Sequence, residues 1–143
     1  MENNNKIYTC LWYDGNALAA AEFYCSIFKN SKIITKTPMV VTFELNGRLF
    51  MGLNGGPMFK FNEAISLVID CENQQEIDYY WTQLTADGGE ESMCGWLKDK
   101  FGMSWQVVPS VLSKLMADPN KGERVMQAVM QMRKFDIEKL LTA

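Results

Sequence analysis

An internal repeat limits the folds that this sequence can adopt. Asn16 and Asn73 each precede a segment with apolar residues at helical spacing, and they lie 57 positions apart. The aromatic pairs Phe23-Tyr24 and Tyr80-Trp81 follow these asparagines at the same interval. Two units of this size with matching helix faces predict two similar modules, each too small to bury a sheet face by itself. A chance match between two amphipathic helices is the alternative.

The first module is predicted to run from about residue 6 to 57. Residues 7–13 form an apolar strand, and Asn16 is expected to cap a helix whose apolar stripe includes Tyr24 and Ile27. Many β-branched residues favour a strand over residues 32–37. The dipeptide Asn46-Gly47 then predicts a tight hairpin between strands 39–45 and 48–53.

The second module is predicted to run from about residue 63 to 109 and to repeat this order. Residues 64–71 form a strand, and Asn73 with Glu76 three residues later makes a capping-box pattern. The helix that follows has Ile77, Trp81 and Leu84 on one face. Both modules therefore read as β-α-β-β-β.

The last hairpin of the second module, residues 94–109, is the segment in which functional side chains are expected. Asp99 and Gly102 bound its turn, since Asp can bond its own backbone and Gly can take positive φ. In the strand after the turn, Trp105 faces one way, with Met103 and Val107, and Gln106 faces the other, with Ser104 and Val108. Pro109 ends strand pairing because it has no N–H group.

The remaining residues, about 110–143, are predicted to be helical. Ser110 is expected to cap a short helix, a longer helix runs from about Gly122 to Lys134, and Asp136 caps a last turn. Met126 and Met130 make the longer helix a soft apolar surface, which either packs on the sheet or forms a subunit interface. We therefore expect one α+β domain over residues 1–143, with two βαβββ modules forming a curved mixed sheet and a C-terminal helical extension.

Composition excludes several classes of function. The net charge is −3 and no basic patch is present, which argues against a nucleic-acid partner. No apolar run approaches the ~20 residues that span a bilayer, and the first five residues contain no apolar signal segment, so we expect no membrane partner and a cytoplasmic location. Histidine is absent, which removes catalysis by Ser-His-Asp or Cys-His and imidazole ligation of a metal.

The four cysteines show no metal-ligand spacing. Cys10, Cys25 and Cys71 lie in apolar segments, so buried reduced thiols are predicted there. Cys94 is the only thiol in a flexible setting, and without histidine it has only Lys98 or Lys100 to lower its pKa.

The order of modules and several short stretches resemble a known superfamily. These stretches are Tyr13-Asp-Gly-Asn-Ala17, Phe23-Tyr24, Phe43-Glu-Leu-Asn-Gly47, Leu53-Asn-Gly-Gly-Pro57, Phe59-Lys-Phe-Asn-Glu-Ala64, Cys94-Gly-Trp96 and Asp99-Lys-Phe-Gly-Met-Ser-Trp-Gln106. They run across nearly the whole chain. Together they resemble the vicinal oxygen chelate superfamily, which includes glyoxalases, ring-cleaving dioxygenases and antibiotic-resistance proteins. The nearer resemblance is to its PhnB-like branch, often labelled 3-demethylubiquinone-9 3-methyltransferase domain.

The resemblance implies a divalent metal held by His or Glu side chains from the first and last strands of each module. The internal repeat maps these positions onto Thr9, Met51, Ser66 and Gln106. None of the four is an imidazole, thiolate or carboxylate, so we predict no metal and no cofactor at this site. These four residues are instead expected to line a ligand pocket in the sheet concavity, together with Trp96 and with Met58 on a lid loop. Within it, Ser66 and Gln106 are expected to lie near each other between the modules and to hydrogen-bond a small ligand.

Three functions are compatible with these observations. The first is a PhnB-like protein that binds a small organic molecule in the sheet concavity without the usual metal. The second is an enzyme acting on a small hydrophobic or quinone-like substrate; for methyl transfer, however, the sequence lacks a G-x-G-x-x-G turn after a strand. The third is a homodimeric scaffold without a ligand. A homodimer is expected in any case, because sheet edges and a Met-rich helix need covering.

Overall fold

A computed structural model describes residues 6–143, and the chain divides into two compact units, with the boundary in the sequence between Phe61 and Asn62. Each unit contains one four-stranded sheet with parallel and antiparallel neighbours. The order β-α-β-β-β occurs once in each unit. The α+β class and the two βαβββ modules predicted from the sequence are therefore confirmed.

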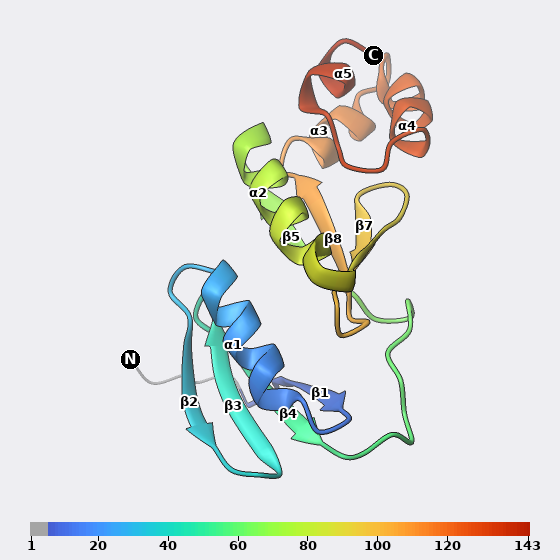
Figure 1. Ribbon diagram of the computed structural model, residues 1–143. Helices are drawn as coiled ribbons and strands as arrows, with labels where there is room; N and C mark the ends of the chain where they lie inside the picture. Colours follow the sequence, from blue (N-terminus) through green and yellow to red (C-terminus); the bar gives the residue numbers. More distant parts are fainter. Residues whose placement is uncertain (1–5) are drawn as a thin grey trace. The chain divides into compact units, whose positions relative to one another are not determined.

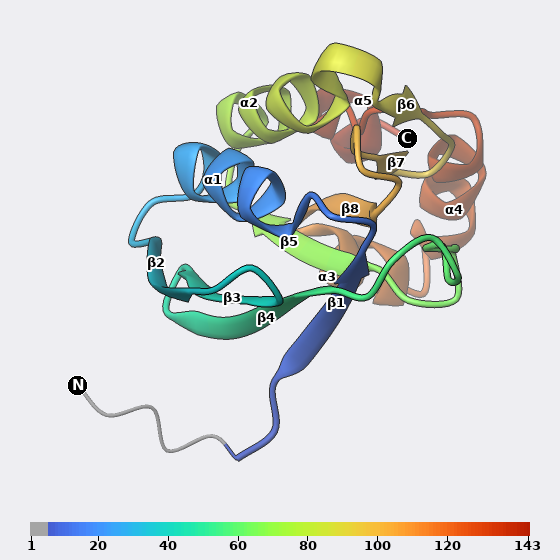
Figure 2. The ribbon, with the colours of Figure 1, turned by 60° about the horizontal axis from the view of Figure 1, so that its bottom comes forward.

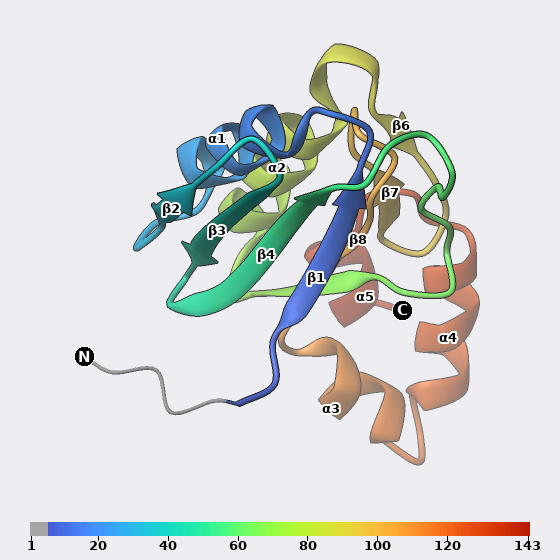
Figure 3. The same ribbon diagram turned by 90° about the horizontal axis from the view of Figure 1, so that it is seen from below.

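The first unit comprises β1 (Thr9–Tyr13), α1 (Ala17–Ile27), β2 (Lys32–Lys36), β3 (Val40–Leu45) and β4 (Arg48–Asn54). Its strand order is β1-β4-β3-β2, which can be followed in Figure 3, and β1 runs parallel to β4. Helix α1 covers one face of this sheet (Figure 2). The core between them contains Leu11, Tyr13, Tyr24, Phe43 and Phe50.

Two local predictions in the first unit have different outcomes. Asn46 and Gly47 both have positive φ, 52° and 80°, so the predicted tight turn between β3 and β4 is confirmed. The prediction that Asn16 caps α1 with its side chain is wrong. Asn54 Oδ1 accepts the hydrogen bond from the Ala17 N–H instead, at 2.9 Å, so the cap comes from the end of β4.

The second unit begins with β5 (Leu67–Cys71), α2 (Gln74–Thr85) and a single 3₁₀ turn, η1 (Ala86–Gly88). The strands β6 (Glu90–Glu91), β7 (Trp96–Lys98) and β8 (Ser104–Pro109) follow. Its strand order is β5-β8-β7-β6, and Figure 1 shows α2 lying beside β5 and β8.

Helix α2 starts as the capping pattern predicts, with one difference in its partner. Asn73 Oδ1 accepts the Glu76 N–H at 2.9 Å, and Glu76 Oε2 accepts the N–H of Glu72 rather than that of Asn73. The buried face of the helix carries Ile77, Trp81 and Leu84.

The C-terminal residues form α3 (Leu112–Ala117), α4 (Gly122–Met130) and α5 (Ile137–Leu141). Asp136 caps α5 as predicted, whereas Ser110 does not cap α3, because the helix begins at Leu112 and Val111 occupies the capping position. The prediction that the long helix reaches Lys134 is also wrong. It ends at Met130, and the carbonyls of the next residues, Met132 and Arg133, accept N–H groups of Cys94 and Gly95.

The segment between α4 and α5 is tied to the second unit at several points. Gln74 of α2 donates to the Phe135 carbonyl and accepts from the Ile137 N–H, both at 2.9 Å. Asp78 pairs with Lys134 at 2.7 Å, and this hydrogen bond lowers the pKa of the Asp78 carboxyl. Phe135 is buried against Gly95, where a Cβ would lie 2.3 Å from the ring. The C-terminal extension is thus part of the second unit's core.

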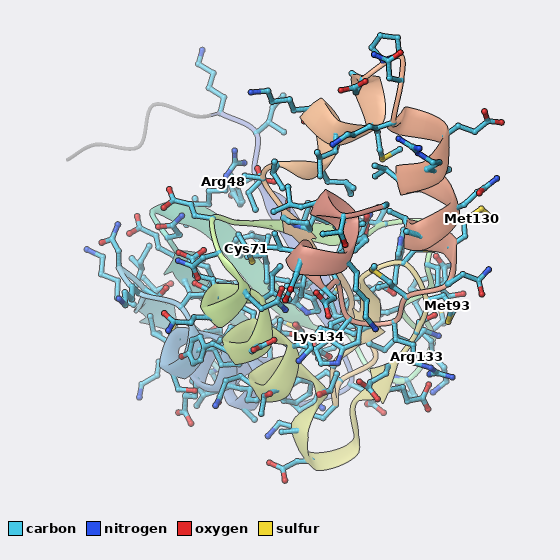
Figure 4. The ribbon with its side chains drawn as sticks, turned by 90° about the horizontal axis from the view of Figure 1, so that it is seen from above. Arg48, Cys71, Met93, Met130, Arg133 and Lys134 are labelled. Carbon is cyan, nitrogen blue, oxygen red and sulfur yellow. The ribbon has the colours of Figure 1, made fainter. Side chains whose placement is uncertain are left out.

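The described residues contain four free cysteines and no helix long and apolar enough to span a membrane. Cys71, which is labelled in Figure 4, is buried at the end of β5, as predicted. Cys10 is exposed and Cys25 only half-buried, so the prediction of buried thiols is wrong for Cys10, because its side chain lies on the sheet face opposite α1.

Asp99 fixes the turn between β7 and β8. It is only 2% exposed, and its Oδ1 accepts the N–H groups of Phe101 and Met103 at 2.8 and 3.1 Å. Its Oδ2 accepts the indole N–H of Trp105 at 2.9 Å. A buried carboxylate with three donors on it is well compensated, and removing it leaves those donors unpaired.

We therefore predict that Asp99→Ala lowers the free energy of unfolding by about 3 kcal/mol or more, measured by urea denaturation. Asp70→Ala, at an exposed position on β5, is the control and should change stability by less than about 0.5 kcal/mol. Equal effects of the two substitutions would show that the Asp99 hydrogen bonds do not stabilise the unit.

Candidate ligand site

The open face of the second sheet is built by the alternation of β8. Gln106 is the pairing partner of Val68 on β5 and of Trp96 on β7. Paired residues of neighbouring strands lie on the same face, so these three side chains share one face. Trp105 pairs with Leu67 and Leu97 and lies on the other, buried side. The predicted alternation of Gln106 and Trp105 is therefore confirmed.

Gln106 makes a specific contact on this open face. Its Nε2 donates a hydrogen bond of 2.9 Å to Oγ of Ser66, the residue that precedes β5. The expected proximity of the two side chains is present, but the expected position between the modules is wrong. Ser66 and Gln106 both belong to the second unit, because β5 and β8 are neighbours in one sheet.

Thr9 and Met51, the corresponding positions of the first unit, do not face each other. The register pairs Thr9 with Phe50 and Cys10 with Met51. Since side chains alternate along a strand, Thr9 and Met51 point to opposite faces of the sheet. The prediction that they line one concavity together is wrong for this reason.

Met58 lies in the loop after β4 and is 77% exposed. The rings beside it are fixed within the first unit. Phe59 packs edge-on against Trp12 with ring centroids 4.8 Å apart, and Phe61 packs in the same way on Tyr13 at 5.3 Å. The role of Met58 as a lid residue stays a prediction.

A hollow of about 500 Å³ lies at the β6–β7 side of the second unit. This volume falls in the range of small-molecule sites. Trp96 lines it and also neighbours Gln106, so the hollow adjoins the Ser66–Gln106 pair. We refer to it below as the Trp96 hollow. Its lining includes Glu63, Glu90, Trp96, Leu97, Lys98 and Ser104.

Charges in the Trp96 hollow are partly paired. Lys98 Nζ lies 2.5 Å from Glu63 Oε1, and this hydrogen bond raises the pKa of the lysine. Glu90 is the pairing partner of Lys98 across β6 and β7, so it lies on the same face. Because Lys98 is already engaged by Glu63, the hollow retains acidic character.

Sequence reasoning identified Trp96 but missed Glu63, Lys98 and Ser104. Lys98 and Ser104 flank the Asp99–Gly102 turn and pair with each other across it. The predicted turn alone places them opposite each other, so the sequence was sufficient to predict this pair. Glu63 lies in a loop, and no pattern in the sequence connects it with Lys98.

The positions implied by the resemblance do not fit a divalent metal. Their donors are two hydroxyls, a thioether and an amide, and two of them point to opposite faces of one sheet. In residues 6–143, no group of three or more Asp, Glu or Cys side chains is arranged to hold a metal ion. The thiols are poor nucleophiles where they are buried, since burial raises the pKa of Cys71 to about 12.

Two βαβββ units with mixed sheets define the class of this protein as a vicinal oxygen chelate fold. Within that class, the model of the 3-demethylubiquinone-9 3-methyltransferase family matches residues 5–108, and the chain belongs to this family. The match ends before the C-terminal helices, so it covers both modules and not the helical extension.

Solved structures agree with this assignment. A putative 3-demethylubiquinone-9 3-methyltransferase, the PhnB protein of Bacillus cereus, is 33% identical, with a TM-score of 0.67 over 73% of this chain and 99% of that one. The protein PA1353 of Pseudomonas aeruginosa is 17% identical, with a TM-score of 0.62 over 74% and 98% of the two chains. The chain therefore belongs to the PhnB-like branch.

A more distant fold relative is a fosfomycin resistance protein, FosX of Listeria monocytogenes, solved with Mn(II) and sulfate. It is 14% identical, with a TM-score of 0.59 over 79% of this chain and 95% of that one. No curated protein matches the chain.

We predict that Cys71 does not react with a thiol reagent at pH 8 in the folded protein, because it is buried and its pKa lies near 12. Cys10 is exposed and should react first. Mass spectrometry of partly modified peptides measures this order. Modification of Cys71 at the rate of Cys10 would contradict the burial of this strand.

Proposed function

We propose that this PhnB-like protein binds a small organic molecule on the open face of its second sheet, without a divalent metal. The observation that carries the proposal is the Gln106–Ser66 hydrogen bond beside the Trp96 hollow. A pair of hydrogen-bonding side chains beside a hollow with an aromatic wall can orient a small ligand. The amide carbonyl of Gln106 and the hydroxyl of Ser66 retain acceptor and donor capacity for such a ligand.

The absence of a metal is part of the same proposal. Four weak neutral donors supply no negative charge to compensate the desolvation of a dication. The Thr9 and Met51 side chains point to opposite faces and supply no joint ligand set. The protein is also proposed to be cytoplasmic and to act as one domain over residues 1–143.

A thermal-shift screen with a library of small organic molecules tests the binding site. We expect at least one compound to raise the melting temperature of the native chain, and Gln106→Leu to abolish that shift. Gln106 and Ser66 are both only half-buried, so losing their bond should cost less than about 1 kcal/mol of stability. Gln83→Leu, on the exposed side of α2, is the matched control and should keep the shift.

If one compound raised the melting temperature of the native protein and of Gln106→Leu equally, the binding site would not be at Gln106. Native mass spectrometry of protein purified from its host adds a second check. A stoichiometric metal that is lost in Gln106→Ala would overturn the metal-free part of the proposal.

We further propose a homodimer. Helix α4 buries Val125 and Val129 but leaves Met126 40% and Met130 60% exposed. In Figure 4, Met130 and Met93 project on the same side of the second unit. Flexible apolar side chains of this kind suit a contact between two copies of the chain.

Sedimentation equilibrium at micromolar concentration is expected to give the mass of two chains. Met130→Glu introduces charge into the proposed contact and should shift the equilibrium toward the monomer, whereas Gln127→Glu, exposed on the same helix, serves as the charge control. A native chain that is monomeric throughout would contradict the homodimer.

A further inference from the structure

We propose that the Trp96 hollow receives the ammonium group of a small organic amine. This inference rests on the proposed function, because it names the chemical class of the ligand at that site. It is carried by a buried hydroxyl, an unpaired carboxylate and an aromatic wall that meet in one hollow.

The buried hydroxyl belongs to Ser104. Ser104 is completely buried and lines the hollow, and its Oγ has no hydrogen-bond partner in the described part of the chain. Buried polar atoms are almost always hydrogen-bonded, and one without a partner is unfavourable. A ligand N–H that donates to Oγ would remove this defect.

The carboxylate belongs to Glu90. Pairing in the β6–β7 and β7–β8 ladders places Glu90 beside Lys98 and Lys98 beside Ser104, so all three side chains share one face. Lys98 is held by Glu63, and the side-chain carboxylate of Glu90 forms no hydrogen bond or ion pair with another residue in 6–143. The third lining carboxylate, Glu91, accepts the indole N–H of Trp81. Glu90 is thus the acidic group left for a ligand.

The aromatic wall is Trp96. The other three tryptophans of the chain donate their indole N–H to Gly56, Glu91 and Asp99, whereas that of Trp96 has no partner in the described residues. Trp96 is half-exposed and lines the hollow. A cation near an indole face is attracted by the ring, and the free N–H can bind an acceptor elsewhere on the same ligand.

These groups discriminate between charge classes. An anion in the hollow would be repelled by Glu90, whereas the lining ammonium of Lys98 is already paired with Glu63. A neutral alcohol satisfies Ser104 but gains nothing from Glu90. An ammonium group satisfies Ser104 and Glu90 together and also gains from Trp96.

Isothermal titration calorimetry with three probes of matched shape tests this inference: phenethylamine, 2-phenylethanol and phenylacetate. We expect phenethylamine to bind the full chain about tenfold more tightly than 2-phenylethanol at low salt, and phenylacetate to bind most weakly. The advantage of the amine should shrink at high salt, since screening weakens exposed charge interactions.

Variants assign the preference to residues. Glu90→Gln should remove most of the difference between amine and alcohol. Glu123→Gln removes an exposed carboxylate in the first turn of α4, outside the lining, and should leave the difference unchanged. Ser104→Ala should leave the melting temperature unchanged or higher and weaken phenethylamine binding severalfold.

Two results would overturn the inference. The first is equal affinity for amine and alcohol, or an amine affinity that neither Glu90→Gln nor Ser104→Ala changes; this result contradicts the amine class. The proposed function still stands in that case if the library screen yields a ligand whose binding depends on Gln106. Failure of all three probes also overturns the amine class, and the screen then decides separately whether any ligand binds.

Discussion

The carboxylate of Asp99 is the constraint on which the second unit's binding face depends. It holds two backbone N–H groups of its own turn and the indole of Trp105, and the turn fixes which residues of β7 and β8 stand opposite each other. A slip of one residue would move every side chain to the other face. Trp96 would then no longer neighbour Gln106, and Ser104 would no longer neighbour Lys98. The ligand site is therefore a consequence of strand register as much as of residue type.

The C-terminal extension also stabilises this binding face, because it holds the segment that leads into β7. The backbone N–H groups of Cys94 and Gly95 are bound by carbonyls of Met132 and Arg133, so the segment that leads into β7 is held by residues beyond the part matched by the family model. Gly95 is required here, because a Cβ would meet the Phe135 ring and because its φ of +81° favours glycine. The extension thus positions one wall of the Trp96 hollow, in which Cys94 also takes part.

The two modules could be predicted from the sequence because the patterns that define them are local. Helical spacing, the Asn46-Gly47 turn and the Asp99–Gly102 turn act over a few residues, and each is present in the structure. Predictions failed where a distant group replaced a local one. The Asn54 side chain takes the place of Asn16 at α1, and α4 ends early because Cys94 and Gly95 bind the carbonyls that follow it. The pairing of Thr9 with Phe50 likewise depends on a parallel register that no turn specifies.

The central claim is that a ligand binds the open face of the second sheet, between Ser66, Gln106 and Trp96. The most direct test is a ¹H–¹⁵N NMR spectrum of the whole chain, recorded with and without the strongest binder from the thermal screen. The side-chain NH₂ of Gln106 and the indole N–H of Trp96 give separate signals, and the account predicts that both shift together with the amide of Ser66. Unchanged signals from these three groups, with shifts confined to residues 6–61, would contradict it.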